Sequence, residues 1–266
     1  MGAVCRDLHK TVLKTRVSAQ IVLYHPVDWN NPTHPLAQRQ PRRGARAILR
    51  ATLATPQGPL VVYNAHFEVF CGMLARIAQL SDIFADTRHM IDSAFYHQVI
   101  LGDLNTMAHG IARFSKNYCC DRMRFLSLGH DEAVMWEQNV LKVQDPRYLP
   151  SHDADVDVAT ATNAGPRVEG SELTPSRPPV NSQLLRWGLD LKYARDAVNP
   201  GFSCPFEASK TVTLDNPAYK LWGYSFMKGK LDWALLRRLR WIKKELGTLN
   251  YELSDHRWML VEVQFE

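Results

Sequence analysis

The sequence predicts a layered α/β fold, in which β-strands are covered by helices. The first observation is a pair of short apolar runs of strand length, at residues 60–63 and 99–101. Between them, residues 71–86 place apolar side chains at helical spacing. Further strand-like runs follow at 230–237 and 260–265, so strands continue late in the chain. Alternation of strand, helix and strand is typical of α/β proteins.

Loop and turn signals delimit the first strands. Residues 25–44 are rich in Pro, Asn and Arg and predict a long loop, after which 45–55 predicts a strand. The turn sequence PQGP follows at 56–59. The continuous apolar run at 60–63 then predicts a strand that is buried on both faces.

The segment 71–86 predicts an amphipathic helix. Arg76 and Gln79 belong to the polar face of this helix, together with two aspartates one and two turns further on. The apolar face is formed by residues at helical spacing, which are Met73, Ile77, Leu80 and Phe84.

The remaining segments define the predicted domain organisation. Two or three short helices are expected within 108–142. Residues 150–183 are dense in Asp, Thr, Pro and Ser, which predicts a loop insertion. We therefore expect an irregular, basic N-terminal segment at 1–44 and one domain at 45–266 that contains the insertion.

Composition excludes several protein classes. With 45% hydrophobic and 22% charged residues, the chain is neither collagen-like, coiled-coil nor wholly disordered. It has no run of about 18 apolar residues, so no transmembrane segment is expected. The net charge of +5 is concentrated in the first 50 residues, which favours polyanionic partners or a solvated basic face. Five cysteines without paired spacing indicate a reducing, intracellular compartment, and the basic, acid-poor N-terminus is also compatible with a mitochondrial presequence.

Polar clusters stand at the ends of the strand-like runs, where a sheet can aim side chains into one site. Carboxylate and amide oxygens can hold a hard cation, which neutralises phosphate charge. A histidine oriented by an acid can deprotonate water, and a second one can protonate or bind the phosphate. Taken one at a time, such clusters are more often turns, caps or a structural histidine, whereas a carboxylate at Asp232 in a core strand needs a partner to offset its desolvation. They are Asn64-Ala65-His66, Gly102-Asp103-Leu104-Asn105, Asp232, and Ser254-Asp255-His256.

Taken in order, these motifs resemble the endonuclease/exonuclease/phosphatase superfamily, which has the deoxyribonuclease I-like fold. Arg76-x-x-Gln79 falls between the first two clusters and completes the series. The matching segments bracket about 45–266, and the insertion at 150–183 has no counterpart. The resemblance is specific for the superfamily and does not specify the substrate.

The resemblance implies an α/β fold of two mixed β-sheets packed face to face with helices outside, a four-layer sandwich. It also implies that the domain is incomplete at its N-terminus. Family members open with a strand–helix–strand unit that carries the glutamate acting as principal magnesium ligand. Nothing before residue 45 matches that unit, and the first glutamate of this chain is Glu68.

The resemblance also implies catalytic roles. His66 matches the histidine that contacts the scissile phosphate or acts as general acid. Asp103 and Asn105 match the pair that orients the attacking water and contacts the metal. His256 matches the general base, or an imidazolium that stabilises the transition state, and Asp232 would orient it.

Metal and supporting residues follow from the same resemblance. Asp255 matches a carboxylate near the metal, so Asp103, Asn105 and Asp255 are the expected ligands of Mg²⁺ or Mn²⁺. Asn64 and Arg76 are expected to contact substrate or to support the site.

The function expected is that of a metal-dependent phosphoester hydrolase of the phosphodiesterase or nuclease type. Its substrate would be a nucleic acid, a phospholipid head group or a small phosphodiester. The alternative is a non-catalytic nucleic-acid or protein-binding module, because the family's metal-binding glutamate has no counterpart. A basic segment between Lys228 and Lys244, interleaved with Trp233 and Trp241, could follow a phosphate backbone or form a solvated strand edge.

Overall fold

A computed structural model describes most of the domain that the sequence predicts. The described residues are 15–22, for which only the backbone is considered, and 46–69, 71–106, 121–149, 179–215, 217, 220–225, 228–247 and 254–266. Most of the predicted insertion, residues 150–178, and the first part of the predicted short-helix region, residues 108–120, lie outside them.

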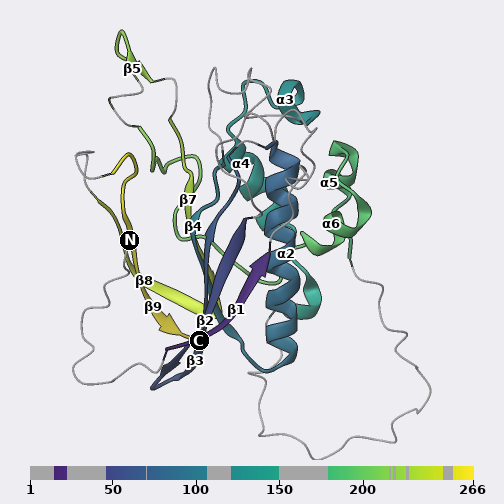
Figure 1. The fold of residues 1–266 in the computed structure, drawn as a ribbon, viewed down its shortest axis with the longest axis vertical. Helices are drawn as coiled ribbons and strands as arrows, with labels where there is room; N and C mark the ends of the chain where they lie inside the picture. Colours follow the sequence, from purple (N-terminus) through teal and green to yellow (C-terminus); the bar gives the residue numbers. More distant parts are fainter. Residues whose placement is uncertain are drawn as a thin grey trace, which may run out of the picture.

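A five-stranded mixed sheet forms the centre of the fold (Figure 1). Its strand order is β1-β2-β3-β4-β7, with β3 and β4 parallel and every other neighbouring pair antiparallel. The parallel pair is possible because a helix connects the two strands. The strands are β1 (Thr15–Val22), β2 (Ala47–Thr55), β3 (Gly58–His66), β4 (His97–Asp103) and β7 (Asp232–Arg237).

Strand β1 corrects part of one prediction. The sequence predicts an irregular segment at 1–44, but Thr15–Val22 pairs antiparallel with β2 at the edge of the sheet. Four of its eight residues are the β-branched types that favour extended backbone. The other residues before 46 lie outside the described part, so the boundary at residue 44 stays a prediction.

Helix α2 (Met73–Asp92) covers one face of this sheet and is longer than the predicted 71–86. It continues because Met90 and Ile91 extend its buried side. All four residues of the predicted apolar face are at most 1% exposed, which confirms that face. The polar face is a correction, since Arg76 and Gln79 are buried.

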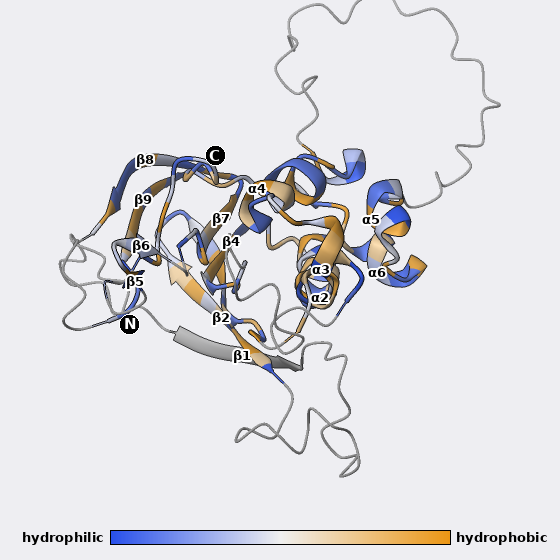
Figure 2. Ribbon diagram, turned by 90° about the horizontal axis from the view of Figure 1, so that it is seen from above, coloured by the Kyte–Doolittle hydropathy of each residue, from blue (hydrophilic) through white to orange (hydrophobic). Residues whose placement is uncertain are grey.

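A two-stranded antiparallel sheet packs on the opposite face of the large sheet. It consists of β8 (Leu239–Leu246) and β9 (Met259–Phe265). Val261, Val263 and Phe265 of β9 pack against a cluster of side chains from β3, β4 and β7. Figure 2 shows the large sheet between α2 on one side and β8–β9 on the other. The predicted arrangement of two sheets face to face with helices outside is thereby confirmed.

The short elements complete the described chain. Three of them, α3, α4 and η2, fall within the predicted short-helix region at 108–142. No helix in the described part is both long and apolar enough to cross a membrane. The short elements are α3 (Met123–Leu126), α4 (Glu132–Trp136), η2 (Glu137–Leu141), η3 (Pro146–Tyr148), α5 (Ser182–Trp187), α6 (Leu191–Asp196), β5 (Lys220–Leu221) and β6 (Tyr224–Ser225).

Candidate active site

Three polar residues predicted from the sequence form a row across the end of the large sheet. His66 on β3 is the register partner of Asp103 on β4, and Asp103 is the register partner of Asp232 on β7. Directly paired residues on neighbouring strands project their side chains to the same face. The strand-end clusters are therefore brought together as the sequence predicts.

The alternation of side chains along β7 explains which face carries the row. Trp233 and Leu235 belong to the core under α2, whereas Leu236 packs in the cluster between the two sheets. Asp232 has the same parity as Leu236 and therefore faces the second sheet. The same alternation on β4 puts Asp103 on the side of Val99, which also packs between the sheets.

His256 reaches this row from the loop that precedes β9. Its Nδ1 lies 2.7 Å from Oδ2 of Asp232, a short, charge-assisted hydrogen bond. Its backbone N–H donates to the hydroxyl of Ser254 at 3.1 Å, which holds the local turn. The Asp232–His256 pair is thus fixed at both the side chain and the backbone.

Asp103 lies between the two histidines, within ion-pair distance of each. Its Oδ2 is 4.0 Å from Nε2 of His256 and 3.7 Å from Nε2 of His66. Both distances exceed hydrogen-bond length. One oxygen atom of a water molecule or a phosphate group could bridge such a separation.

The electrostatics of His256 favour its charged form. Burial by itself would lower the pKa of this imidazole. The hydrogen bond and the charge of Asp232, reinforced by the charges of Asp103 and Asp255, outweigh that effect and raise the pKa to about 9. At neutral pH His256 is therefore an imidazolium, and of its two expected roles the stabilising cation is favoured over the general base.

The pKa of Asp103 is also raised. Burial is the largest cause, and the charge of Asp232 adds to it, whereas the charge of His256 and the backbone N–H of Asn105 act in the opposite direction. The result is a pKa of about 6. A carboxylate that titrates close to neutral pH is well matched to accept a proton from water.

Asn105 supports the row but turns its amide nitrogen away from it. The residue is 4% exposed, and its Nδ2 donates to the carbonyl oxygen of Phe67 at 2.9 Å. Its backbone, at φ 51°, is in the left-handed region that Asn tolerates. Its backbone N–H donates to Oδ1 of Asp103 at 2.8 Å, which orients that carboxylate.

The other predicted site residues lie at different distances from the row. Asn64 is exposed on β3, two positions before His66 and on the same face. Asp255 is exposed and acts on Asp103 and His256 through its charge.

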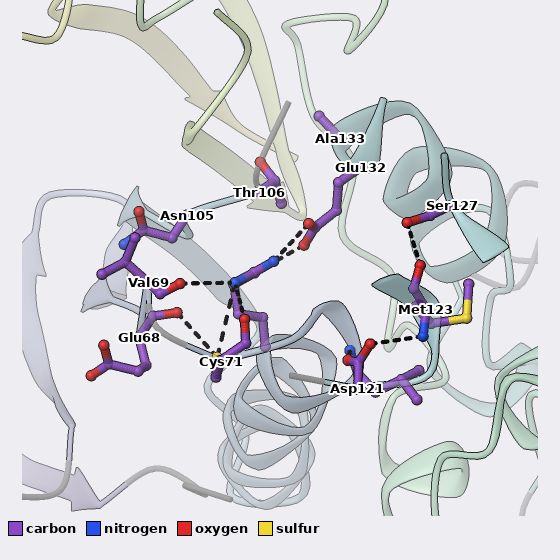
Figure 3. A network of polar contacts seen from close by, with 12 residues as sticks. Glu68, Val69, Cys71, Asn105, Thr106, Asp121, Met123, Ser127, Glu132 and Ala133 are labelled. Atoms are coloured by element: carbon purple, nitrogen blue, oxygen red, sulfur yellow. Dashed lines mark hydrogen bonds and ion pairs between the residues drawn. The ribbon is translucent and has the colours of Figure 1, made fainter. Parts of the chain in front are cut away.

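Arg76 lies on α2, on the other side of the sheet, and does not contact the row. Its guanidinium forms a buried ion pair with Glu132 at 2.7 Å and donates to the carbonyl oxygens of Cys71 and Val69 (Figure 3). Gln79 accepts a hydrogen bond from the backbone N–H of Glu68. The two residues hold the loop that follows His66, which agrees with a supporting role and not with substrate contact.

Sequence reasoning missed Thr213. Its hydroxyl accepts hydrogen bonds from the backbone N–H groups of Leu231 at 2.9 Å and Asp232 at 3.1 Å. This contact fixes the start of β7, where Asp232 is placed. No sequence signal marks it, because threonine 19 residues away could bond to almost any neighbour.

The predicted basic, aromatic segment is only partly on the surface. Lys230 is buried, donates to the carbonyl oxygen of Phe206, and lies 3.5 Å from the ring centroid of Trp233. Trp233 itself is 2% exposed and cannot stack on a nucleobase. Trp241 is 45% exposed and remains available.

A magnesium site is only partly assembled by these residues. The carboxylates of Asp103 and Asp255 are suitable hard ligands. However, Asp232 is engaged with His256, and the amide nitrogen of Asn105 is engaged with a backbone carbonyl. Among the described residues, no group of three or more His, Cys, Asp or Glu side chains is placed to hold a metal ion. Dependence on Mg²⁺ or Mn²⁺ therefore stays a prediction.

Comparison with known proteins gives matches among solved structures only. No protein family and no curated protein matches the sequence. ANGEL2, a 2',3'-cyclic phosphatase, matches with a TM-score of 0.44 and 11% identity over 95% of this chain and 68% of its own. An endonuclease/exonuclease/phosphatase from Beutenbergia cavernae matches with a TM-score of 0.37 and 13% identity, over 94% of this chain and 45% of its own. The human Nocturnin catalytic domain matches with a TM-score of 0.36 and 12% identity, over 95% of this chain and 60% of its own.

One of these matched structures, the protein from Beutenbergia cavernae, carries the name of the superfamily that the motif order resembles. The chain spans less than two thirds of the length of two of these three proteins. Because the three TM-scores are below 0.5, the likeness carries no argument about activity.

Proposed function

We propose that this chain hydrolyses phosphate esters at the row formed by His66, Asp103 and Asp232, with His256 above it. The observation that carries the proposal is the 2.7 Å pair of Asp232 and His256 beside a second carboxylate of raised pKa. In this proposal His256 serves as a fixed cation and Asp103 as the base, and their Nε2 and Oδ2 atoms lie 4.0 Å apart.

The proposed step is attack of water on phosphorus. Ionised Asp103 accepts the proton of the attacking water, so that hydroxide character develops as the phosphorus–oxygen bond forms. The imidazolium of His256 donates a hydrogen bond to a non-bridging phosphate oxygen, whose negative charge it offsets. Asp232 keeps Nε2 of His256 directed at that oxygen.

The leaving alcohol departs as the second phosphorus–oxygen bond breaks. His66 lies on the other side of Asp103, with its side chain 55% exposed. It is placed to donate a proton to a leaving oxygen that points toward solvent. A divalent cation attracted by Asp103 and Asp255 would add charge neutralisation, and its requirement is a separate prediction.

The test is turnover of bis-p-nitrophenyl phosphate by the full 266-residue chain, in Mg²⁺, Mn²⁺ or EDTA. Asp103→Asn and His256→Gln should each lower kcat at least 100-fold. General-base catalysis contributes a factor of about 10²–10⁴ to the rate, and one electrostatic donor a factor of about 10²–10³. The matched control is Asp92→Asn, an exposed aspartate at the end of α2.

Absence of turnover in a folded chain with every cation would sink the proposal and favour the binding-module alternative. That alternative predicts nucleic-acid binding that weakens steeply with salt. Turnover that persists in both site variants would place the chemistry elsewhere.

A further inference from the structure

A second site is formed by a cavity of about 270 Å³ at the opposite end of the large sheet from the candidate active site. Its lining includes Arg237, the last residue of β7, whereas Asp232 is the first. At a rise of about 3.3 Å per residue, the two ends of this strand are roughly 17 Å apart. Glu266 also lines the cavity and marks its place in Figure 1, next to the label C.

Arg237 lines this cavity and is 3% exposed. Its guanidinium donates to the carbonyl oxygens of Pro200 at 2.8 Å, Tyr96 at 2.6 Å and Tyr148 at 3.1 Å. These three bonds use neutral acceptors and leave two of the five N–H groups of an arginine. A buried cation held only by neutral groups is not compensated for its loss of hydration.

Arg238 adds a second cation beside the first. It is the single residue between β7 and β8, its φ is 53°, and its Nε is buried without a hydrogen-bond partner in the described part of the chain. Burial first, and the charge of Arg238 second, lower the pKa of Arg237 to about 10. Neither guanidinium forms an ion pair with a described carboxylate, Glu266 included.

Two further lining residues define what could occupy the cavity. Arg240 is exposed on β8 and brings a third guanidinium, bonded to Gln264 at 2.7 Å. Trp241 presents a half-exposed ring beside it. The volume is close to the lower end of small-molecule sites, about 300 Å³, so the cavity suits a small ligand and not a polymer.

We propose that this cavity binds a phosphate dianion, either free or as the monoester of a small organic molecule, through Arg237 and Arg238. Guanidinium groups match the oxygens of phosphate with paired hydrogen bonds. The dianion would neutralise the two adjacent charges, and its oxygens would accept hydrogen bonds from the two remaining N–H groups of Arg237 and from Nε–H of Arg238. The site is separate from the row that contains Asp103 and does not depend on its activity.

The experiment is calorimetric titration of the full chain with inorganic phosphate, in EDTA and at ionic strength held constant with chloride. Arg238→Gln should weaken binding about 10-fold to 100-fold, the worth of a charge-assisted hydrogen bond of about 1.5–3 kcal/mol. Arg186→Gln, an exposed arginine of α5, is the control for loss of one positive charge and should bind like the unchanged chain. Arg240→Gln provides a second variant of the cavity, at an exposed lining residue.

The two ends of the sheet are distinguished by His256→Gln. Phosphate binding that survives His256→Gln and falls in Arg238→Gln supports the cavity. The proposed cavity site is overturned if phosphate binding is lost in His256→Gln and unchanged in both Arg238→Gln and Arg240→Gln. It is also overturned if the chain binds no phosphate at millimolar concentration. Titration with adenosine 5'-monophosphate and ribose 5-phosphate separates the sources, since tighter binding of the first would show that Trp241 contributes.

Discussion

Asp103 and Asp232 are direct register partners on antiparallel strands, so two carboxylates face each other at the end of β4 and β7. Like charges in this position normally destabilise a sheet. Here His256 binds one of them and lies 4.0 Å from the other. The sheet therefore holds a strained pair of charges at the place where the proposed chemistry occurs.

Asp103→Asn should stabilise the protein at pH 8 while removing activity. The folded-state pKa of Asp103 is raised from 3.8 to about 6, so its contribution to stability is present below about pH 4 and is lost as pH rises through 6. Two pKa units correspond to about 3 kcal/mol, an upper value for the gain. Urea unfolding at pH 4 and pH 8 measures it, and an equal difference at both values would contradict the assigned cause.

Asp232→Asn should lower the pKa of His256 from about 9 to its ordinary value or below. The reason is that burial alone lowers this pKa, and Asp232 is the main group that reverses the effect. The measurement is an NMR titration of the His256 ring, with Asp92→Asn as the control expected to stay near 9. A value unchanged in Asp232→Asn would show that Asp103 and Asp255 suffice.

His256 also makes stability depend on pH in the alkaline range. Because its folded-state pKa is raised from 6.5 to about 9, its contribution is complete below about pH 6.5 and is lost as pH rises through 9. The stability of His256→Gln should therefore change less with pH between about 6.5 and 9 than that of the unchanged chain. Thermal unfolding across that range gives the comparison, and parallel curves for the two proteins would refute the expectation.

The pH profile of kcat/KM should be bell-shaped. Activity should rise as Asp103 ionises near pH 6 and fall as His256 loses its proton near pH 9. In His256→Gln the residual activity should lose the alkaline limb and keep the acidic one. If the residual activity keeps both limbs, His256 is not the group that titrates.

Arg76→Met should destabilise the fold by about 3–5 kcal/mol, because it leaves the carboxylate of Glu132 buried without its partner. Replacing both residues with apolar ones of similar volume should restore most of that stability. Chemical unfolding of the single and double variants tests this. The folded double variant should keep both limbs of the pH profile, since Arg76 supports a loop and does not touch the row.

Local sequence patterns predicted the elements whose burial is one-sided or complete. The helix was predicted because its apolar residues repeat at 3.6-residue spacing, and all four are buried. Strand β8 was expected only as one of two alternatives, because Arg240, Lys243 and Lys244 made its segment equally compatible with a basic surface that follows a phosphate backbone; these residues lie on an exposed strand. Arg76 was assigned to a polar face because its partner Glu132 is 56 residues away.

The members of the site could be predicted, but their chemical states could not. Polar clusters at the ends of strand-like runs marked His66, Asp103, Asp232 and His256, and the resemblance added their catalytic roles. Whether His256 acts as base or as cation depends on the burial and charges around it, which no local pattern contains. The engagement of the Asn105 amide with a backbone carbonyl is likewise a property of the folded loop.

The hydrogen bond from Nε1 of Trp233 to the hydroxyl of Thr106 joins residues 127 positions apart. Pairing β4 with β7 therefore closes a very long loop, and chains with such contacts fold slowly. The site cannot exist in any early, locally formed intermediate, because two of its four residues, Asp232 and His256, lie on β7 and in the loop before β9. Recovery of activity during refolding should thus be synchronous with the burial of Trp233 and later than the formation of helix α2.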